Sequence, residues 1–257
     1  MKYVRVLAAG IPLWGRLHGD EAVLLDAAPW EGGTPTGERV EHAGVHLLAP
    51  VTPSKIVAVG SNYPKHAAEM GKQVPSVPRI FLEAPSAVIA PGEAIEIPPE
   101  TTRVDPEGEL AVVIGRRLRR AAPDDVPAAI FGYTCLNDVT CRDFQKSDGL
   151  FTRAKGFDTF CPVGPWIETE IDASDLAIRT VVNGEVRGDG RTSEMFFGVP
   201  ALLAFISRIM TLYPGDVVST GTPPGVAPIT AGDQVSVTIE GIGTLSNPVV
   251  DREDRDR

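Results

Sequence analysis

The sequence DPEGELAVVIG, residues Asp105–Gly115, decides the fold of this chain. Its second half, Leu110–Gly115, is an unbroken apolar run with the length of a strand buried on both faces. Its first half carries two glutamates, Glu107 and Glu109. Side chains of a strand alternate between its faces, so both carboxylates should project on the same side. We therefore expect a buried strand that begins with an acidic pair at the mouth of a core.

Other short apolar segments extend the strand pattern in both directions along the chain. They are Tyr3–Leu7, Ala22–Leu25, Val45–Leu48, Lys55–Gly60, Ile178–Val182, Val217–Thr220 and Gln234–Ile239. The dipeptide Asn183-Gly184 predicts a hairpin between Ile178–Val182 and Glu185–Arg187, because both residues tolerate the positive φ angles of a type I′ turn. The Gly, Pro and Thr-rich stretch Gly32–Gly37 is typical of a connection between strands.

Helices are fewer. Apolar residues recur at helical spacing at Leu202, Phe205, Ile206 and Ile209, with Pro214-Gly215 beyond the end. Shorter helices are expected over residues 62–70 and 124–130. The pattern predicts a β-rich α+β protein.

After Pro50 and Pro53, short strands with turns give way to apolar strands of the buried type. This change predicts a small N-terminal β domain over residues 1–53 and a larger domain over residues 54–250. The charged tail, residues 251–257, is expected to be disordered.

Composition narrows the class of protein. The chain of 257 residues has a formal net charge of −10, which argues against nucleic acid or an anionic membrane as a partner. No apolar run approaches the roughly 20 residues of a membrane span. Three cysteines without a C-x-x-C spacing favour a reducing, cytoplasmic setting.

Three acidic residues are candidates for a metal site: Glu107, Glu109 and Asp138. Carboxylates gathered on one face repel each other unless they are solvated, protonated or bound to a cation, and such oxygen ligands suit Mg²⁺, Mn²⁺ or Ca²⁺. The alternatives are a solvated acidic strand end for the glutamates and a helix N-cap for Asp138. From spacing alone these alternatives are favoured.

His66 and Glu69 lie three residues apart and would share a helix face, where the carboxylate would orient the imidazole as a general base. An exposed ion pair is the simpler interpretation of that spacing. Lys155 is a candidate for holding a substrate carboxylate, against an ordinary surface lysine. The turn Thr220–Gly225 is either an anion-binding loop or only a tight turn.

Taken together and in order, many segments resemble the fumarylacetoacetate hydrolase superfamily over residues 54–250. The segments are Lys55–Gly60, Asn62-Tyr63, His66, Asp105–Gly115, Gly132–Thr134, Asn137–Thr140, Arg142–Gln145, Lys155–Thr159, Pro162–Pro165, Val182–Gly184, Pro214–Asp216, Thr220–Pro223 and Gly232-Asp233.

The resemblance implies a mixed β-sandwich or roll with few helices, in a homodimer. It implies that Glu107, Glu109 and Asp138 bind Mg²⁺ or Mn²⁺ and that a His66–Glu69 dyad moves protons. Substrate would be held by side chains at four positions: Arg142, Gln145, Lys155 and Thr222.

The activity that the resemblance implies is metal-dependent chemistry on a small 2-oxo or 2-hydroxydienoic acid. Isomerisation or decarboxylation of 2-hydroxyhepta-2,4-diene-1,7-dioate-type substrates in aromatic catabolism is the first expectation. Acylpyruvate hydrolysis with C–C cleavage, oxaloacetate decarboxylation and a catalytically silent ligand-binding role remain alternatives.

Three positions depart from the family pattern: Glu83, Pro106 and Ala227. Family members often carry lysine in place of Glu83, and we expect this residue to remove a positive charge near the active-site entrance.

Overall fold

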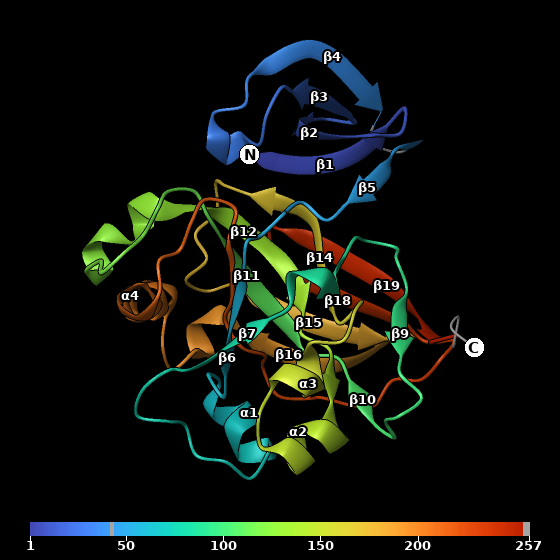
Figure 1. Cartoon of the computed structure of the whole chain (residues 1–257), viewed down its shortest axis with the longest axis vertical. Helices are drawn as coiled ribbons and strands as arrows, with labels where there is room; N and C mark the ends of the chain where they lie inside the picture. Colours follow the sequence, from blue (N-terminus) through green and yellow to red (C-terminus); the bar gives the residue numbers. More distant parts are fainter. Residues whose placement is uncertain (42–43, 254–257) are drawn as a thin grey trace.

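Two antiparallel strands, β11 (Gly108–Ile114) and β12 (Ile130–Asn137), lie at the centre of the molecule (Figure 1). They belong to a computed structural model that describes residues 1–41 and 44–253. The segment Asp105–Gly115 therefore supplies a strand in the middle of the larger sheet, and the β-rich α+β class is confirmed.

The larger sheet runs in the order β4-β3-β2-β1-β14-β12-β11-β17-β6-β7, with β5 paired to β1 and β8 to β14. Its other strands are β1 (Lys2–Ala8), β2 (Ile11–His18), β3 (Glu21–Leu25), β4 (Pro35–Glu41), β5 (His46–Leu48), β6 (Ile56–Gly60), β7 (Arg79–Glu83), β8 (Val88–Ile89), β14 (Cys161–Glu168) and β17 (Val217–Ser219).

A smaller sheet has the order β16-β15-β18-β19-β9, and β10 pairs with β13 separately. These strands are β9 (Ile95–Ile97), β10 (Val104–Asp105), β13 (Thr140–Cys141), β15 (Ala177–Val182), β16 (Glu185–Arg191), β18 (Gln234–Ile239) and β19 (Gly243–Asp251). The predicted β15–β16 hairpin is confirmed, with φ angles of 52° at Asn183 and 83° at Gly184.

The two faces of β11 bury different cores. Leu110 and Val112 pack in a cluster with residues of the smaller sheet and of the long helix α4 (Val199–Ile209). Ala111 and Val113 pack in a second cluster on the opposite face, beside β14 and β17. Glu109 shares the face of Ala111 and Val113, so the acidic end of the strand opens from this second core.

Helices gather around the end of the sheet where the acidic residues lie. Figure 1 shows α1 (Pro64–Glu69), α2 (Arg142–Asp148) and α3 (Thr152–Lys155) together at the lower end of the molecule. The predicted α4 and α1 are confirmed. Within the described residues, no helix is long and apolar enough to cross a membrane.

Two predictions about local structure were wrong. Residues 124–130 form short 3₁₀ turns, Pro123–Asp125 and Pro127–Ala129, because Pro127 lacks the N–H that a continuous helix needs. The charged tail does not begin at residue 251, since Asp251 pairs with Ile97 in β9 and the Arg252 N–H donates to the same residue's carbonyl. Residues 254–257 lie outside the described part of the chain.

The first strands stand apart at the top of the molecule in Figure 1 and join the rest through β1. Residues Lys2 and Tyr3 of β1 pair with Glu168 and Ile167 of β14. Val4 and Val6 are fully buried in a cluster of their own. The N-terminal unit thus extends the larger sheet, while the division at residue 53 stays a prediction.

Candidate metal centre and active site

Strand register brings Glu107 and Asp138 side by side. Gly108 pairs with Asn137 across β11 and β12, and both acidic residues lie just beyond that pair. The Glu107 N–H donates to Asn137 Oδ1 at 2.9 Å, and the Asp138 N–H donates to the Glu107 carbonyl at 2.9 Å. These contacts therefore fix the backbone positions from which the two carboxylate side chains extend.

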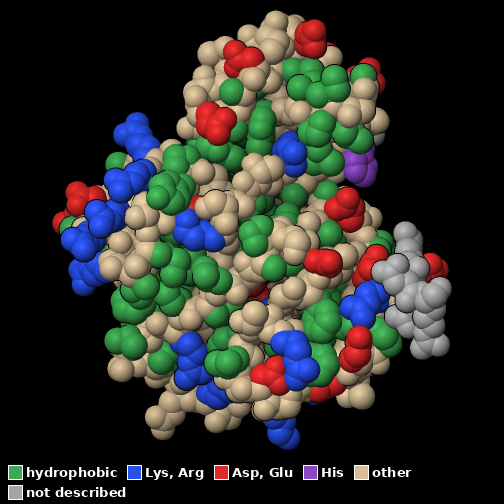
Figure 2. Space-filling view, in the orientation of Figure 1, with side chains coloured by type: hydrophobic (Ala, Val, Ile, Leu, Met, Phe, Trp, Pro, Cys, Tyr) green, Lys and Arg blue, Asp and Glu red, His purple; other side chains and the backbone are tan. Residues whose placement is uncertain are grey.

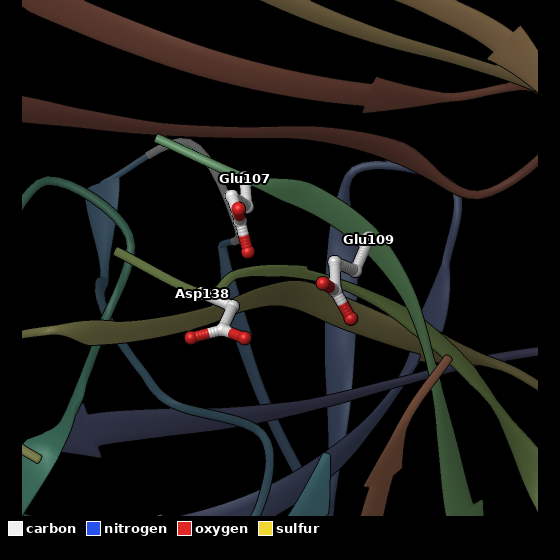
Figure 3. A group of neighbouring side chains, drawn as sticks. All are labelled: Glu107, Glu109 and Asp138. Atoms are coloured by element: carbon white, nitrogen blue, oxygen red, sulfur yellow. The ribbon is translucent and has the colours of Figure 1, made fainter. Parts of the chain in front are cut away.

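The three predicted metal ligands converge. One carboxylate oxygen from each of Glu107, Glu109 and Asp138 lies within 4.8 Å of the others, and Figure 3 shows the three side chains turned toward a common space. Their exposed fractions are only 5, 2 and 1 %. A solvated strand end is excluded by this burial. The helix N-cap is also excluded for Asp138, because α2 begins at Arg142 and Cys141 precedes it.

Two cations reach this cluster. The Lys155 ammonium donates to Glu107 Oε2 at 2.7 Å and to Asp138 Oδ2. The Arg142 guanidinium donates to Glu107 Oε1 at 2.7 Å and to Asp105 Oδ2 at 2.8 Å. Neither of these two cations forms an ion pair with Glu109. The negative charges of the triad are therefore unevenly compensated.

That unevenness separates the pKa values of the three acids. Burial raises the pKa of Glu107, but Lys155 and Arg142 outweigh it and hold the pKa below its ordinary value. Burial raises the pKa of Asp138 to about 6 against the opposing pull of Lys155. Burial and the Asp138 charge raise the pKa of Glu109 well above its ordinary value. A cation closer to Glu109 and Asp138 would favour their ionised forms.

The donor set fits a hard divalent cation. Asp138 Oδ1 is buried and has no hydrogen-bond partner among the described residues. Glu109 Oε2 accepts hydrogen bonds from Ser219 Oγ and from the Gly221 N–H at 2.7 Å, which turns this carboxylate toward the other two. All three ligands are oxygens, as Mg²⁺ and Mn²⁺ prefer.

His66 of the His66–Glu69 pair faces the triad, whereas Glu69 lies on the solvent side of the imidazole. His66 Nδ1 lies 3.2 Å from Glu69 Oε2, and Nε2 lies 3.8 Å from Glu107 Oε1. The Gly225 N–H donates to Glu69, which holds that carboxylate in place. His66 is buried, so an exposed ion pair is excluded. The arrangement leaves Nε2 directed toward the carboxylates, with Nδ1 oriented by Glu69.

The predicted substrate-binding residues line one small cavity with His66 and the two glutamates. Lys155, Arg142, Gln145 and Thr222 all border it, and the Arg142 guanidinium donates to Gln145 Oε1 at 3.1 Å. The Lys155 side chain is buried, not the surface lysine of the alternative interpretation. Thr222 Oγ1 donates to the Gly108 carbonyl at 3.0 Å, which ties its side chain to the beginning of β11.

One expectation about the entrance was wrong. Glu83 ends β7 with only 3 % of its surface exposed, and it lies close enough to the triad for the charges of Asp138 and Glu109 to act on it. No nitrogen or oxygen donor of the described residues reaches its oxygens, and the buried Cys161 thiol is the hydrogen-bonding neighbour that acts on it. Burial and the nearby Asp138 charge raise the pKa of Glu83 well above its ordinary value. The apolar neighbours of Glu83 in β7 are the one local feature of the sequence that indicates this burial.

Several supporting residues were not predicted. Asp105 is fully buried and holds Arg142, and Asn137, Ser219 and Gly221 position the acidic residues. Their contacts join segments up to 112 residues apart in the chain, which local pattern cannot reveal.

Both parts of the chain match known protein families. Residues 55–250 match the family model "Fumarylacetoacetate (FAA) hydrolase C-terminal", and residues 1–50 match the model "Rv2993c-like, N-terminal". Protein Rv2993c of Mycobacterium tuberculosis is 55% identical over 240 residues, covering 90% of this chain and 89% of that protein. Oxaloacetate tautomerase YisK of Bacillus subtilis is 41% identical over 220 residues, covering 80% of this chain and 73% of that protein.

Solved structures agree over nearly the whole chain. A 5-carboxymethyl-2-hydroxymuconate delta-isomerase from Mycobacterium smegmatis has a TM-score of 0.93 at 44% identity, covering 98% of this chain and 100% of that one. A 2-hydroxyhepta-2,4-diene-1,7-dioate isomerase from Mycobacterium marinum has a TM-score of 0.92 at 44% identity, with coverages of 99% and 100%. A maleylpyruvate hydrolase from Sphingobium sp. SYK-6, solved with manganese(II) and pyruvate, has a TM-score of 0.81 at 31% identity, with coverages of 98% and 100%.

The family match spans most of the chain, and the acidic triad, the histidine facing it and the cations beside it lie within that span. The chain belongs to the fumarylacetoacetate hydrolase family.

Proposed function

We propose that this protein is a divalent-metal-dependent enzyme that acts on a 2-oxo acid or its enol. The observation that carries the proposal is the buried triad of Glu107, Glu109 and Asp138, faced by the Nε2 atom of His66. Buried carboxylates that are only partly neutralised are poised for a cation. An imidazole beside them is poised for proton transfer.

A divalent cation held by the triad would polarise the carboxylate and 2-oxo oxygens of the substrate and stabilise the enolate charge. The remaining work belongs to the chain itself. Arg142, Gln145 and Lys155 bind and orient the substrate carboxylate. Phe81 and Phe151, whose ring centroids lie 4.7 Å apart, border the cavity and exclude water from one side.

His66 holds or moves the proton. With Glu69 accepting from Nδ1–H, the Nε2 lone pair is free to take a proton from the carbon next to the 2-oxo group and to return it elsewhere. Glu69 keeps the ring in this tautomer, as its own position is fixed by the Gly225 N–H.

Isomerisation is our first choice of reaction, on 2-hydroxyhepta-2,4-diene-1,7-dioate-type substrates of aromatic catabolism. It needs only proton removal and return at an enolate, and two relatives at 44% identity are named as isomerases of such acids. Keto–enol tautomerisation of oxaloacetate uses the same two steps and is the second candidate, favoured by the name of the B. subtilis relative. Oxaloacetate decarboxylation and acylpyruvate hydrolysis, the latter with water attacking a more distant carbonyl, extend the same chemistry.

The test is a panel of 2-hydroxydienoic acids, acylpyruvates and oxaloacetate, followed by ultraviolet absorbance and product mass with Mg²⁺, Mn²⁺ or EDTA. We expect turnover that requires the metal, and we expect His66→Gln to lose turnover while still binding Mn²⁺. Metal binding without turnover of any acid would instead support a silent ligand-binding protein. Full activity of the metal-free protein would contradict the proposal.

We also propose that residues 54–250 form the catalytic domain and that the chain is a homodimer, as the family likeness suggests. Light scattering of the full chain after size exclusion tests the second statement. A mass near 27 kDa, that of one chain, would contradict it.

A further inference from the structure

The cavity at the triad continues into a much larger cleft. The inner cavity has a volume of about 30 Å³, room for little more than a water molecule. The outer cleft has a volume of about 680 Å³ and shares Met70, Lys72, Arg142, Gln145 and Phe151 with the inner one. A substrate chelated at the triad therefore has room for its remote end only in the outer cleft.

The lining of the outer cleft is cationic in a chain whose net charge is −10. Its charged residues are Lys72, Arg79, Arg103, Arg142, Lys146 and Glu69. Figure 2 shows Lys and Arg side chains on the lower part of the molecule, where Figure 1 places α1 and α2.

Part of this positive charge is already neutralised. Arg103 and Arg142 both pair with Asp105. Glu69, the one acidic residue of the lining, is bound to His66 and the Gly225 N–H. Among the described residues, no hydrogen bond or ion pair occupies the side chains of Lys72 and Arg79. Lys146 of the same lining also has no such partner in the described part of the chain, but of these three residues only Lys72 borders the inner cavity as well, and the charge of Arg79 acts on Lys72.

Their positions are fixed by separate elements. The Lys72 N–H donates to the Ala67 carbonyl at 2.8 Å, so Lys72 follows α1 directly. Arg79 begins β7, whose residue Phe81 borders the inner cavity. Partial burial, together with the charges of Arg79 and Arg142, lowers the pKa of Lys72. Such mutual repulsion is relieved when an anion binds between the groups.

We propose that Lys72 and Arg79 form a distal anion subsite that binds a second carboxylate of the substrate. The enzyme would then select 2-oxo or 2-hydroxydienoic acids with a remote carboxylate over mono-acids of the same length. This inference rests on the proposed function, since it places the first carboxylate at the triad. Lys72 and Arg79 are specificity-determining residues and take no part in proton transfer.

The test compares two seven-carbon ligands that differ only at the remote end. Binding of 2-oxoheptanedioate and of 2-oxoheptanoate to the Mg²⁺-saturated protein is measured by calorimetry. We expect the di-acid to bind the native protein more tightly, by about tenfold or more for a charge-assisted contact. Lys72→Met and Arg79→Met should each weaken binding of the di-acid and leave that of the mono-acid unchanged.

The control is Arg119→Met, which removes one exposed positive charge that does not line the cleft. It should change neither affinity. The preference for the di-acid should also shrink as salt rises, since the contact lies in a solvent-open cleft.

The binding measurements distinguish the absence of a distal subsite from a wrong proposed function. Equal affinities of the two ligands, or equal losses of both in the Lys72 and Arg79 variants, would overturn the distal subsite alone. If neither ligand binds the native protein in the presence of Mg²⁺, the proposed function fails and the subsite with it.

Discussion

At the residue scale, the site depends on carboxylates placed where ionisation is costly. Glu107 is stabilised by Lys155 and Arg142, whereas Glu109 depends on Ser219 and the Gly221 N–H. Two cations cannot fully compensate three buried acids. A divalent ion would complete the charge balance of the three carboxylates and the two cations beside them.

Replacing Asp138 by Asn should abolish function without unfolding the protein. Lys155 keeps its contact with Glu107 in the variant, so no buried cation is left unpaired. We expect Asp138→Asn to lose about 100-fold or more in Mn²⁺ affinity, with a corresponding loss of turnover. Calorimetry measures the affinity and circular dichroism the fold. Asp124→Asn, at an exposed position, is the control and should change neither.

Glu83 should make stability depend on pH. Its pKa in the folded protein is raised above the unfolded value, so its favourable contribution is complete below about pH 4.5 and is lost as pH rises toward the folded pKa. Glu83→Gln keeps the shape of the protonated acid and should remove this dependence. We expect the variant to gain on the native protein by up to about 1.4 kcal/mol per pH unit.

Urea unfolding of both proteins in EDTA, at several values between pH 5 and pH 9, measures that difference. The same free-energy difference at every pH would show that Glu83 is not held in its protonated form.

At the element scale, regular patterns were predictable and long-range contacts were not. The helical spacing of α4 and the Asn183-Gly184 turn are local signals, and both are confirmed. The first residues of strand β4 (Pro35–Glu41) were assigned to the connection Gly32–Gly37, because the exposed residues of this strand lack an apolar alternation and only pairing with β3 orders them. The contacts of Ser219 and Gly221 with Glu109 could not be predicted for the same reason. They form only because β17 pairs with β11.

The loop after β17 should be sensitive to a single methyl group. Gly221 has a φ of +97°, and an added Cβ would lie 3.0 Å from Asn62 Cβ and 3.2 Å from the Val59 carbonyl oxygen. Gly221→Ala should therefore displace the N–H that holds Glu109, weakening Mn²⁺ binding and costing about 1–3 kcal/mol of stability.

Gly184→Ala provides the matched control. Gly184 also has a positive φ, +83°, but nothing lies within 4 Å of an added Cβ in this hairpin turn. It should lose stability and keep its Mn²⁺ affinity. Equal effects of the two substitutions on metal binding would contradict the role given to the Gly221 N–H.

Helix α4 should contribute through its buried face. Leu202 is fully buried in the cluster that joins the helix to both sheets, whereas Ile209 is 57 % exposed. Leu202→Ala should lower the free energy of unfolding by about 2–5 kcal/mol. Ile209→Ala should cost much less. Denaturant titrations measure both, and similar losses would show that α4 does not pack as described.

At the scale of the whole molecule, charge is distributed unevenly. The chain carries a net charge of −10, yet five of the six charged residues that line the cleft leading to the triad are Lys or Arg. Such a cleft attracts small anions while the rest of the surface repels large ones. The sequence predicted the overall acidity. It could not place Lys72 and Arg79 together, because that requires α1 and β7 to border one cleft.

Metal binding should stabilise the entire fold, because the triad joins the beginning of β11 to the end of β12. At a metal concentration of 100 times the Kd, linkage predicts a gain of about 2.7 kcal/mol. Thermal unfolding with Mg²⁺ and with EDTA should therefore differ for the native protein and coincide for Asp138→Asn. An equal response of the two proteins would place the stabilising ion elsewhere.

The most direct test of the central claim is a crystal structure grown with Mn²⁺ and read by anomalous scattering. We expect one strong peak in the buried site, bonded to an oxygen of each of Glu107, Glu109 and Asp138, with His66 Nε2 facing it. A peak only at other residues, or a buried site without manganese at saturating concentration, would contradict it.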